Sequence, residues 1–191
     1  MGFHRDFLLS LQNTVMTNVD LSRVPDFYHK YINLITEPDL TRAFEKHQVN
    51  LLSILMDIPG EKWNHRYEQQ KWSIKELVQH IIDAERIFSY RALHIARQDK
   101  IELPGFEEND YAKASKADKR TKEDLIEELS IVQKASAKLF ASFDDEQLNE
   151  TGIANRNSIY VGGIGFIIIG HALHHKNILL ERYLQEKTIH A

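Results

Sequence analysis

Residues that interrupt helices are scarce in this chain and are concentrated in a few places. Its 191 residues include only four prolines and eight glycines, and most of the glycines fall between residues 152 and 170. Long intervals without proline or glycine favour helices. No alternation of apolar and polar residues is long enough to indicate a substantial sheet. The chain is therefore predicted to be all-α.

Four of these intervals carry apolar residues at helical spacing. Three of them follow a residue whose side chain can accept a backbone N–H of the first helical turn. The clearest signal is Ser73 with Glu76, a reciprocal capping box. The expected helices are Leu40–Met56, Ile74–Gln98, a third from the cap at Thr121 to about Ser142, and a fourth over Ile164–Gln185. Four helices of this length predict a four-helix bundle.

The connections between these helices differ in length. The link between the second and third helices, residues 99–120, is far longer than an antiparallel turn needs. It can run the length of the bundle, so that these two helices lie parallel. The segment before the fourth helix, residues 152–163, is rich in turn residues and suits one short hairpin. Residues 1–23 are expected to form an N-terminal arm, and residues 24–191 a single domain.

Composition excludes several classes of protein and site. The chain contains no cysteine, so it has no disulfide, no thiolate metal site and no cysteine nucleophile. The net charge of −4, without a block of lysine and arginine, offers no footprint for nucleic acid. The longest apolar run, residues 161–170, is half the roughly 20 residues that span a membrane. We expect a cytoplasmic protein with neither a membrane nor a nucleic-acid partner.

Three histidines follow that apolar run in the segment GHALHH, residues 170–175. His171 and His175 are four residues apart, so they lie on one face of a helix and can bind one ion. His174 points about 100° away from the adjacent His175 and is expected to lie outside such a site. Buried imidazole nitrogens need partners. The pair alone leaves two interpretations open: core histidines bonded to other side chains, or metal ligands.

His80 provides a third inward-facing imidazole. It lies about two turns into the second expected helix, among apolar residues. Alone it is typical of a core histidine. Three inward histidines on two buried helices favour a metal site, because one divalent ion accepts a nitrogen from each. Three protein ligands leave positions open for water or substrate, as in a reactive metal centre. Imidazoles without thiolate favour zinc or nickel, with copper possible.

Other polar residues give weaker signals. Asp83 and Glu85 are either paired with nearby arginines or available for acid–base work, and Asp83 could orient a ligating histidine. The segment LPGFEENDYA, residues 103–112, either crosses the bundle or covers the open side of the metal. In the second case, Asn109 and Tyr111 are predicted to contact the substrate.

Three segments taken together resemble the DinB-like (DinB/YfiT-type) superfamily of metalloenzymes. They are KWSIKELVQHIIDAERIFSYRA, LPGFEENDYA and GFIIIGHALHHKNILLERYL, and the resemblance covers about residues 24–185. It implies a bundle with up-down-down-up helix order, in keeping with the long second connection. It also implies a nickel or zinc ion held by His80, His171 and His175. Relatives are often homodimers, and some use a low-molecular-weight thiol such as bacillithiol, mycothiol or glutathione.

Two classes of function follow from these predictions. One is an enzyme of S-transferase type, in which the metal lowers the pKa of a low-molecular-weight thiol that attacks a small electrophile. Metal-dependent hydrolysis of a small molecule is a variant of this class. The other is a non-catalytic metal-binding module. No catalytic residue beyond the metal ligands is assigned, and an open coordination position beside a solvent-reachable pocket would distinguish the two classes.

Overall fold

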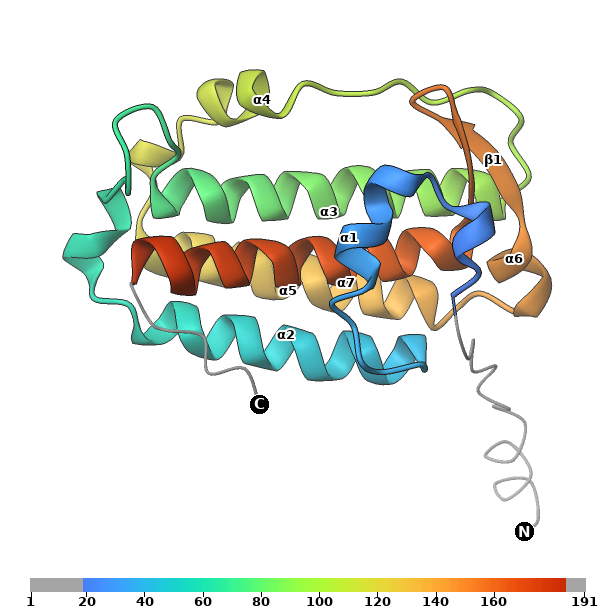
Figure 1. The fold of residues 1–191 in the computed structure, drawn as a ribbon, viewed down its shortest axis with the longest axis horizontal. Helices are drawn as coiled ribbons and strands as arrows, with labels where there is room; N and C mark the ends of the chain where they lie inside the picture. The colour runs from blue at the N-terminus through green and yellow to red at the C-terminus, as the bar shows by residue number, and fades with distance from the viewer. Residues whose placement is uncertain (1–18, 185–191) are drawn as a thin grey trace, which may run out of the picture.

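Four long helices form a bundle (Figure 1). The computed structural model describes residues 19–184. The helices are α2 (Leu40–Asp57), α3 (Ile74–Ala96), α5 (Lys122–Phe140) and α7 (Val161–Ile178). Helix α3 packs against α5 and α7, and α2 packs against the same two helices. The predicted four-helix bundle is confirmed, but a small two-stranded sheet accompanies the helices. Most of the expected N-terminal arm and the expected helix end at Gln185 lie outside the described residues.

Local capping fixes where three of the long helices begin. The Ser73 hydroxyl accepts a hydrogen bond from the Glu76 backbone N–H, and the Glu76 carboxylate accepts one from the Ser73 backbone N–H. Asp39 caps α2 and Thr121 caps α5 in the same manner, each with its side chain on a backbone N–H of the first turn. These interactions depend only on neighbouring residues, which is why the sequence located them.

Helix α7 begins three residues earlier than expected. The prediction began at Ile164 because glycines usually weaken a helix, yet α7 starts at Val161 and includes three glycines in its first turns. These glycines lie where other elements pack closely: a Cβ at Gly163 would lie 2.7 Å from Val24, and one at Gly165 would lie 2.9 Å from Leu40. Close packing therefore outweighs the low helix propensity of glycine here.

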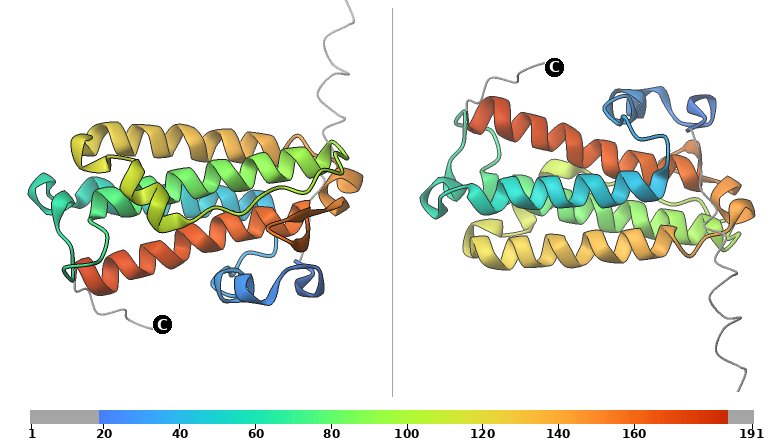
Figure 2. Two further views of the ribbon diagram at one scale, coloured as in Figure 1. Left: turned by 90° about the horizontal axis from the view of Figure 1, so that it is seen from above. Right: turned by 90° about the horizontal axis from the view of Figure 1, so that it is seen from below.

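The long connection runs along the outside of the bundle (Figures 1 and 2). It contains a short helix, α4 (Glu108–Ala114), and a 3₁₀ turn, η4 (Ala117–Lys119), both packed on α3. In Figure 1, α3 and α5 both begin at the left, whereas α2 and α7 begin at the right. The connection thus returns the chain to the end at which α3 began.

The expected short hairpin joins α5 to α7, after a further short helix, α6 (Asp145–Asn149). Its strands are β1 (Thr151–Ala154) and β2 (Asn157–Tyr160), paired antiparallel with Thr151 opposite Tyr160. The two turn residues, Asn155 and Arg156, both have positive φ angles, of 51° and 64°. Two-residue hairpin turns with positive φ match the twist of the strands that they join.

The described N-terminal residues fold onto α7, as Figure 2 shows. They form two 3₁₀ turns, η1 (Leu21–Arg23) and η2 (Asp26–Tyr28), and a one-turn helix, α1 (His29–Ile32). Val24 and Ile32 are buried in the core. A further 3₁₀ turn, η3 (Gly60–Asn64), follows α2, and a π-helical turn, η5 (Leu179–Tyr183), follows α7.

The buried apolar side chains form two clusters along the bundle. One includes Phe88 and Ile167, and the other includes Ile81 and Leu179. The two clusters meet on α7 beside the histidines, since Leu173 belongs to the first cluster and Ala172 to the second. Within residues 19–184, no helix combines the length and the apolar character that crossing a membrane requires.

Candidate metal centre

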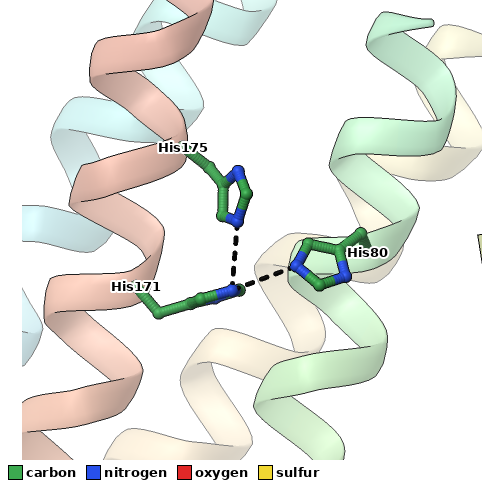
Figure 3. Close-up of side chains that lie close together, drawn as sticks. All are labelled: His80, His171 and His175. Carbon is green, nitrogen blue, oxygen red and sulfur yellow. Dashed lines mark hydrogen bonds between the residues drawn. The ribbon is translucent and has the colours of Figure 1, made fainter. Parts of the chain in front are cut away.

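Three histidines from two adjacent helices point their rings toward one another (Figure 3). His80 comes from α3, and His171 and His175 come from successive turns of α7. The Nε2 atom of His171 lies 3.0 Å from Nε2 of His80 and 3.1 Å from Nε2 of His175. The three potential ligand nitrogens all lie within 4.8 Å of one another. The structure thus brings together the three histidines singled out from the sequence.

Hydrogen bonding alone does not satisfy this arrangement. A ring nitrogen carries either one proton or one lone pair in the ring plane, so Nε2 of His171 can form a full hydrogen bond with only one of its two neighbours. A cation would instead accept a lone pair from each ring. A tetrahedral zinc ion with bonds of about 2.0–2.1 Å separates its ligand nitrogens by about 3.4 Å. The observed spacing and the all-imidazole donor set therefore fit a divalent cation.

Burial keeps these imidazoles uncharged. His80 is 4% exposed, and His171 and His175 are each 8% exposed. Burial lowers the pKa of His80 to about 4. The pKa values of His171 and His175 lie well below the ordinary value, first because of burial and second because the neighbouring histidines repel a second charge. At neutral pH the three rings can therefore offer lone pairs to a cation.

Aromatic rings surround the histidine cluster. Tyr31 of α1 meets His171 edge to face, with ring centroids 5.6 Å apart. Trp72, in the loop before α3, lies over His80 at 4.6 Å. Phe88 of α3 lies 6.2 Å from His171. Sequence reasoning missed Tyr31 and Trp72, because no regular spacing relates them to the histidines.

One sequence signal could have indicated the contact with α1. A Cβ atom at Gly170 would lie 2.4 Å from the backbone oxygen of Tyr31. Only glycine allows α1 to approach α7 so closely at this point. The glycine directly before the first α7 histidine therefore marks where another backbone crosses the helix.

His174 lies outside the cluster, as its helical angle predicts. It is half-buried, and its ring packs against Tyr31 with centroids 5.0 Å apart. Burial lowers its pKa, and the positive charges of Lys30 and Arg182 add to that effect. His174 thus contacts the same tyrosine as His171 without joining the three converging nitrogens.

Neither candidate carboxylate forms an ion pair with the nearby arginines, Arg86 and Arg91. Asp83 accepts a hydrogen bond of 2.9 Å from the side chain of Gln79, one turn earlier on α3. Glu85 is 4% exposed and is held in the core, where burial raises its pKa to about 7. The arginines proposed as their partners bind elsewhere: Arg86 pairs with Glu128, and Arg91 donates to the carbonyl of Pro104.

Asn109 and Tyr111 belong to α4, away from the histidine cluster. Asn109 donates to the Glu107 carboxylate at 3.4 Å. Tyr111 is 46% exposed and lines a cavity of about 400 Å³ on the outside of α3. The cavity is lined by Asp83, Arg86, Ile87, Tyr111, Ala114 and Ser115. The structure therefore does not bring the two predicted substrate contacts together with the three histidines.

Comparisons with known proteins agree with this architecture. The family model of the DinB superfamily matches residues 43–179, which include all three histidines. A solved structure, YfiT from Bacillus subtilis, matches with a TM-score of 0.66 and 13% sequence identity, over 90% of this chain and 95% of that one. It is described as a probable metal-dependent hydrolase with an unusual four-helix bundle topology. At this identity the likeness concerns the fold. No curated protein matches the chain.

Proposed function

The chain belongs to the DinB superfamily, and we propose that it is a metal-dependent enzyme acting on a small molecule. His80, His171 and His175 hold one divalent cation, nickel or zinc, in a bundle of up-down-down-up helix order. The observation that carries the proposal is the convergence of three buried Nε2 atoms from α3 and α7.

The protein's own residues contribute position and charge state. Their low pKa values keep the three imidazoles neutral, so they do not repel a cation at neutral pH. When bound, such a cation supplies Lewis acidity that lowers the pKa of a water or thiol ligand. Neutral ligands leave the cation its full positive charge, which favours anionic ligands. The rings of Tyr31 and Trp72 limit the access of bulk water to the histidines.

Hydrolysis is the reaction suggested by the similarity in fold to YfiT, which is described as a probable metal-dependent hydrolase. Thiol transfer to a small electrophile uses the same Lewis acidity. Because the chain contains no cysteine, the thiolate must then come from a low-molecular-weight thiol. Both reactions need the same three histidines, so the metal site is tested first and the reaction second.

The metal site is tested by elemental analysis of purified protein and of two histidine variants. We expect about one divalent ion per wild-type chain and none in His171→Ala, because two imidazoles bind much more weakly than three. His174→Ala is the matched control, since it removes an imidazole from the same helix outside the cluster, and it should keep the ion. Equal metal content in wild type and His171→Ala would refute the assignment.

The reaction is tested on metal-loaded and chelator-stripped protein side by side. One panel contains small esters, amides and phosphate esters, and the other contains bacillithiol, mycothiol or glutathione with a small electrophile. Metal-dependent turnover in the first panel supports hydrolysis, and turnover in the second supports thiol transfer. If the loaded protein is inactive in both panels, a non-catalytic metal-binding module becomes the better description.

A further inference from the structure

The three histidines differ in how the fold fixes them. His171 and His175 share one helix, so their spacing is set by helical geometry. His80 comes from α3, and its ring orientation must be fixed by side-chain contacts across the bundle. The ring that covers it is Trp72, at 4.6 Å between centroids, and Trp72 also lies 6.5 Å from His175.

Trp72 is itself held by the helix that carries the other two histidines. The Tyr183 hydroxyl donates a hydrogen bond of 2.6 Å to the backbone carbonyl of Trp72. Tyr183 is 6% exposed and ends the π-helical turn η5, which directly continues α7. π-Helical turns are rare and occur frequently at functional sites.

These contacts connect α7, which carries His171 and His175, to the ring of His80 on α3. It runs from α7 through η5 to Tyr183, then through the Trp72 backbone and indole to the ring of His80. We propose that Tyr183 and Trp72 are positioning residues for His80, which hold its imidazole in the orientation required for the shared cation. The inference rests on the proposed metal site and adds to it two residues that contact no cation themselves.

Loss of these contacts should weaken metal binding by a measurable amount. Residues that fix the orientation of a metal ligand commonly alter metal affinity by 10–100-fold when they are changed. Removing the Tyr183 hydroxyl would leave the Trp72 carbonyl without its partner and release the loop that carries the indole. His80 would then sample several ring orientations, only some of which point Nε2 toward His171.

The experiment compares Tyr183→Phe with Tyr160→Phe. Both variants lose one phenolic hydroxyl from a buried tyrosine that is hydrogen-bonded to the backbone. The Tyr160 hydroxyl, however, accepts a hydrogen bond of 2.8 Å from the Asp20 backbone N–H at the opposite end of α7. Zinc affinity is measured by competition with a chromophoric chelator. We expect about tenfold weaker binding in Tyr183→Phe and unchanged binding in Tyr160→Phe.

A second measurement uses metal-free protein. The ring ¹H–¹³C signals of His80, assigned with a His80→Ala variant, should shift or broaden in Tyr183→Phe and stay unchanged in Tyr160→Phe. If Tyr183→Phe does not fold, Trp72→Leu replaces it and is judged by zinc affinity and by broadening of the His80 signals, because loss of the indole ring current shifts these signals in any case. Wild-type affinity together with unchanged His80 signals in a folded variant would overturn the proposal. If wild type binds no zinc, the metal site fails, and the His80 signals still decide whether the two residues position this ring.

Discussion

At the scale of single residues, Glu85 is a buried ionisable side chain that the proposed reaction does not use. Its Oε1 atom has no hydrogen-bond partner within the described part of the chain, and the same holds for Oε1 of Gln133. Both residues line one small interior cavity. Burial raises the pKa of Glu85 to about 7, and a hydrogen bond from Ser136 lowers it only in part. The Glu85 carboxyl therefore keeps its proton up to a higher pH in the folded protein than in the unfolded chain.

This proton makes stability depend on pH in a predictable direction. The pKa of Glu85 is about 4.5 in the unfolded chain and about 7 in the folded protein, so folding is favoured below pH 4.5 and progressively less as pH rises to 7. Glu85→Gln cannot ionise. Between pH 5 and 8, the free energy of unfolding should fall by about 2–3 kcal/mol more in wild type than in this variant. Urea titrations across that range measure the difference.

The control for this prediction is Glu123→Gln, at an exposed position on α5. It makes the same chemical change without removing a buried carboxyl group, so its pH profile should follow wild type. Parallel profiles for wild type and Glu85→Gln would mean that Glu85 is ionised in the folded protein throughout this range.

The residues of the candidate site differ in how far sequence could locate them. His171 and His175 were placed together because four residues make just over one helical turn. His80 was placed inward because its neighbours on α3 are apolar. The positions of Tyr31 and Trp72 beside the histidines depend on contacts between segments about 100–140 residues apart and, for Trp72, on the path of a loop. No local sequence pattern encodes such contacts. Glu85 was expected to pair with an arginine, because the sequence shows which residues neighbour it along the helix. The sequence does not show that the Glu85 side chain faces the core.

At the scale of elements, α1 is held in place by its packing on α7. A one-turn helix is not stable by itself, and here its backbone lies against Gly170. This contact places Tyr31 over His171. The position of one aromatic wall of the site therefore depends on the absence of a side chain at one residue of α7.

We predict that Gly170→Ala destabilises the protein. In a helix interior, alanine is favoured over glycine by about 1 kcal/mol. The new Cβ, however, would lie 2.4 Å from the Tyr31 carbonyl oxygen, and backbone atoms cannot move aside cheaply. Overpacking of this kind costs about 1–3 kcal/mol and should exceed the helix gain. Chemical denaturation measures the balance.

Gly60→Ala is the matched control, since nothing lies within 4 Å of a Cβ placed there. Its stability should stay within about 0.5 kcal/mol of wild type. A Gly170→Ala protein as stable as this control would show that α1 can leave α7 without cost.

Element prediction succeeded where local signals are strong and failed where packing decides. The capping residues and apolar spacing of α2, α3 and α5 were sufficient to place these helices to within about two residues. Helices α1, α4 and α6 are too short for a periodic pattern to identify. The start of α7 was misplaced because glycine propensity argued against a helix that tight packing stabilises.

At the scale of the whole molecule, the candidate site joins α3 to α7 in the middle of the core. A ligand that binds only the folded state stabilises it by RT ln(1 + [L]/Kd), about 2.7 kcal/mol at a hundredfold excess over Kd. Because the histidines come from two helices, the unfolded chain cannot present them together. Bound metal should therefore raise global stability and not merely order one loop.

The pH dependence of this stabilisation follows from the histidine pKa values. His80 has a pKa of about 4 in the folded protein against 6.5 in the unfolded chain, so below pH 6.5 the unfolded chain binds protons that the folded site excludes. In the metal-free protein, stability is then lost as pH falls from 6.5 toward 4. Protons compete with the cation for the same nitrogens only as pH approaches the folded-state pKa values.

At a hundredfold excess over the Kd measured at pH 7.5, zinc should add about 2.7 kcal/mol to the free energy of unfolding at that pH. The same zinc concentration should add only slightly less at pH 5, because burial keeps the three rings largely uncharged there. Removing the metal with a chelator should reverse the gain, and His171→Ala should gain nothing at either pH. An equal gain in wild type and His171→Ala would place the bound zinc elsewhere on the protein.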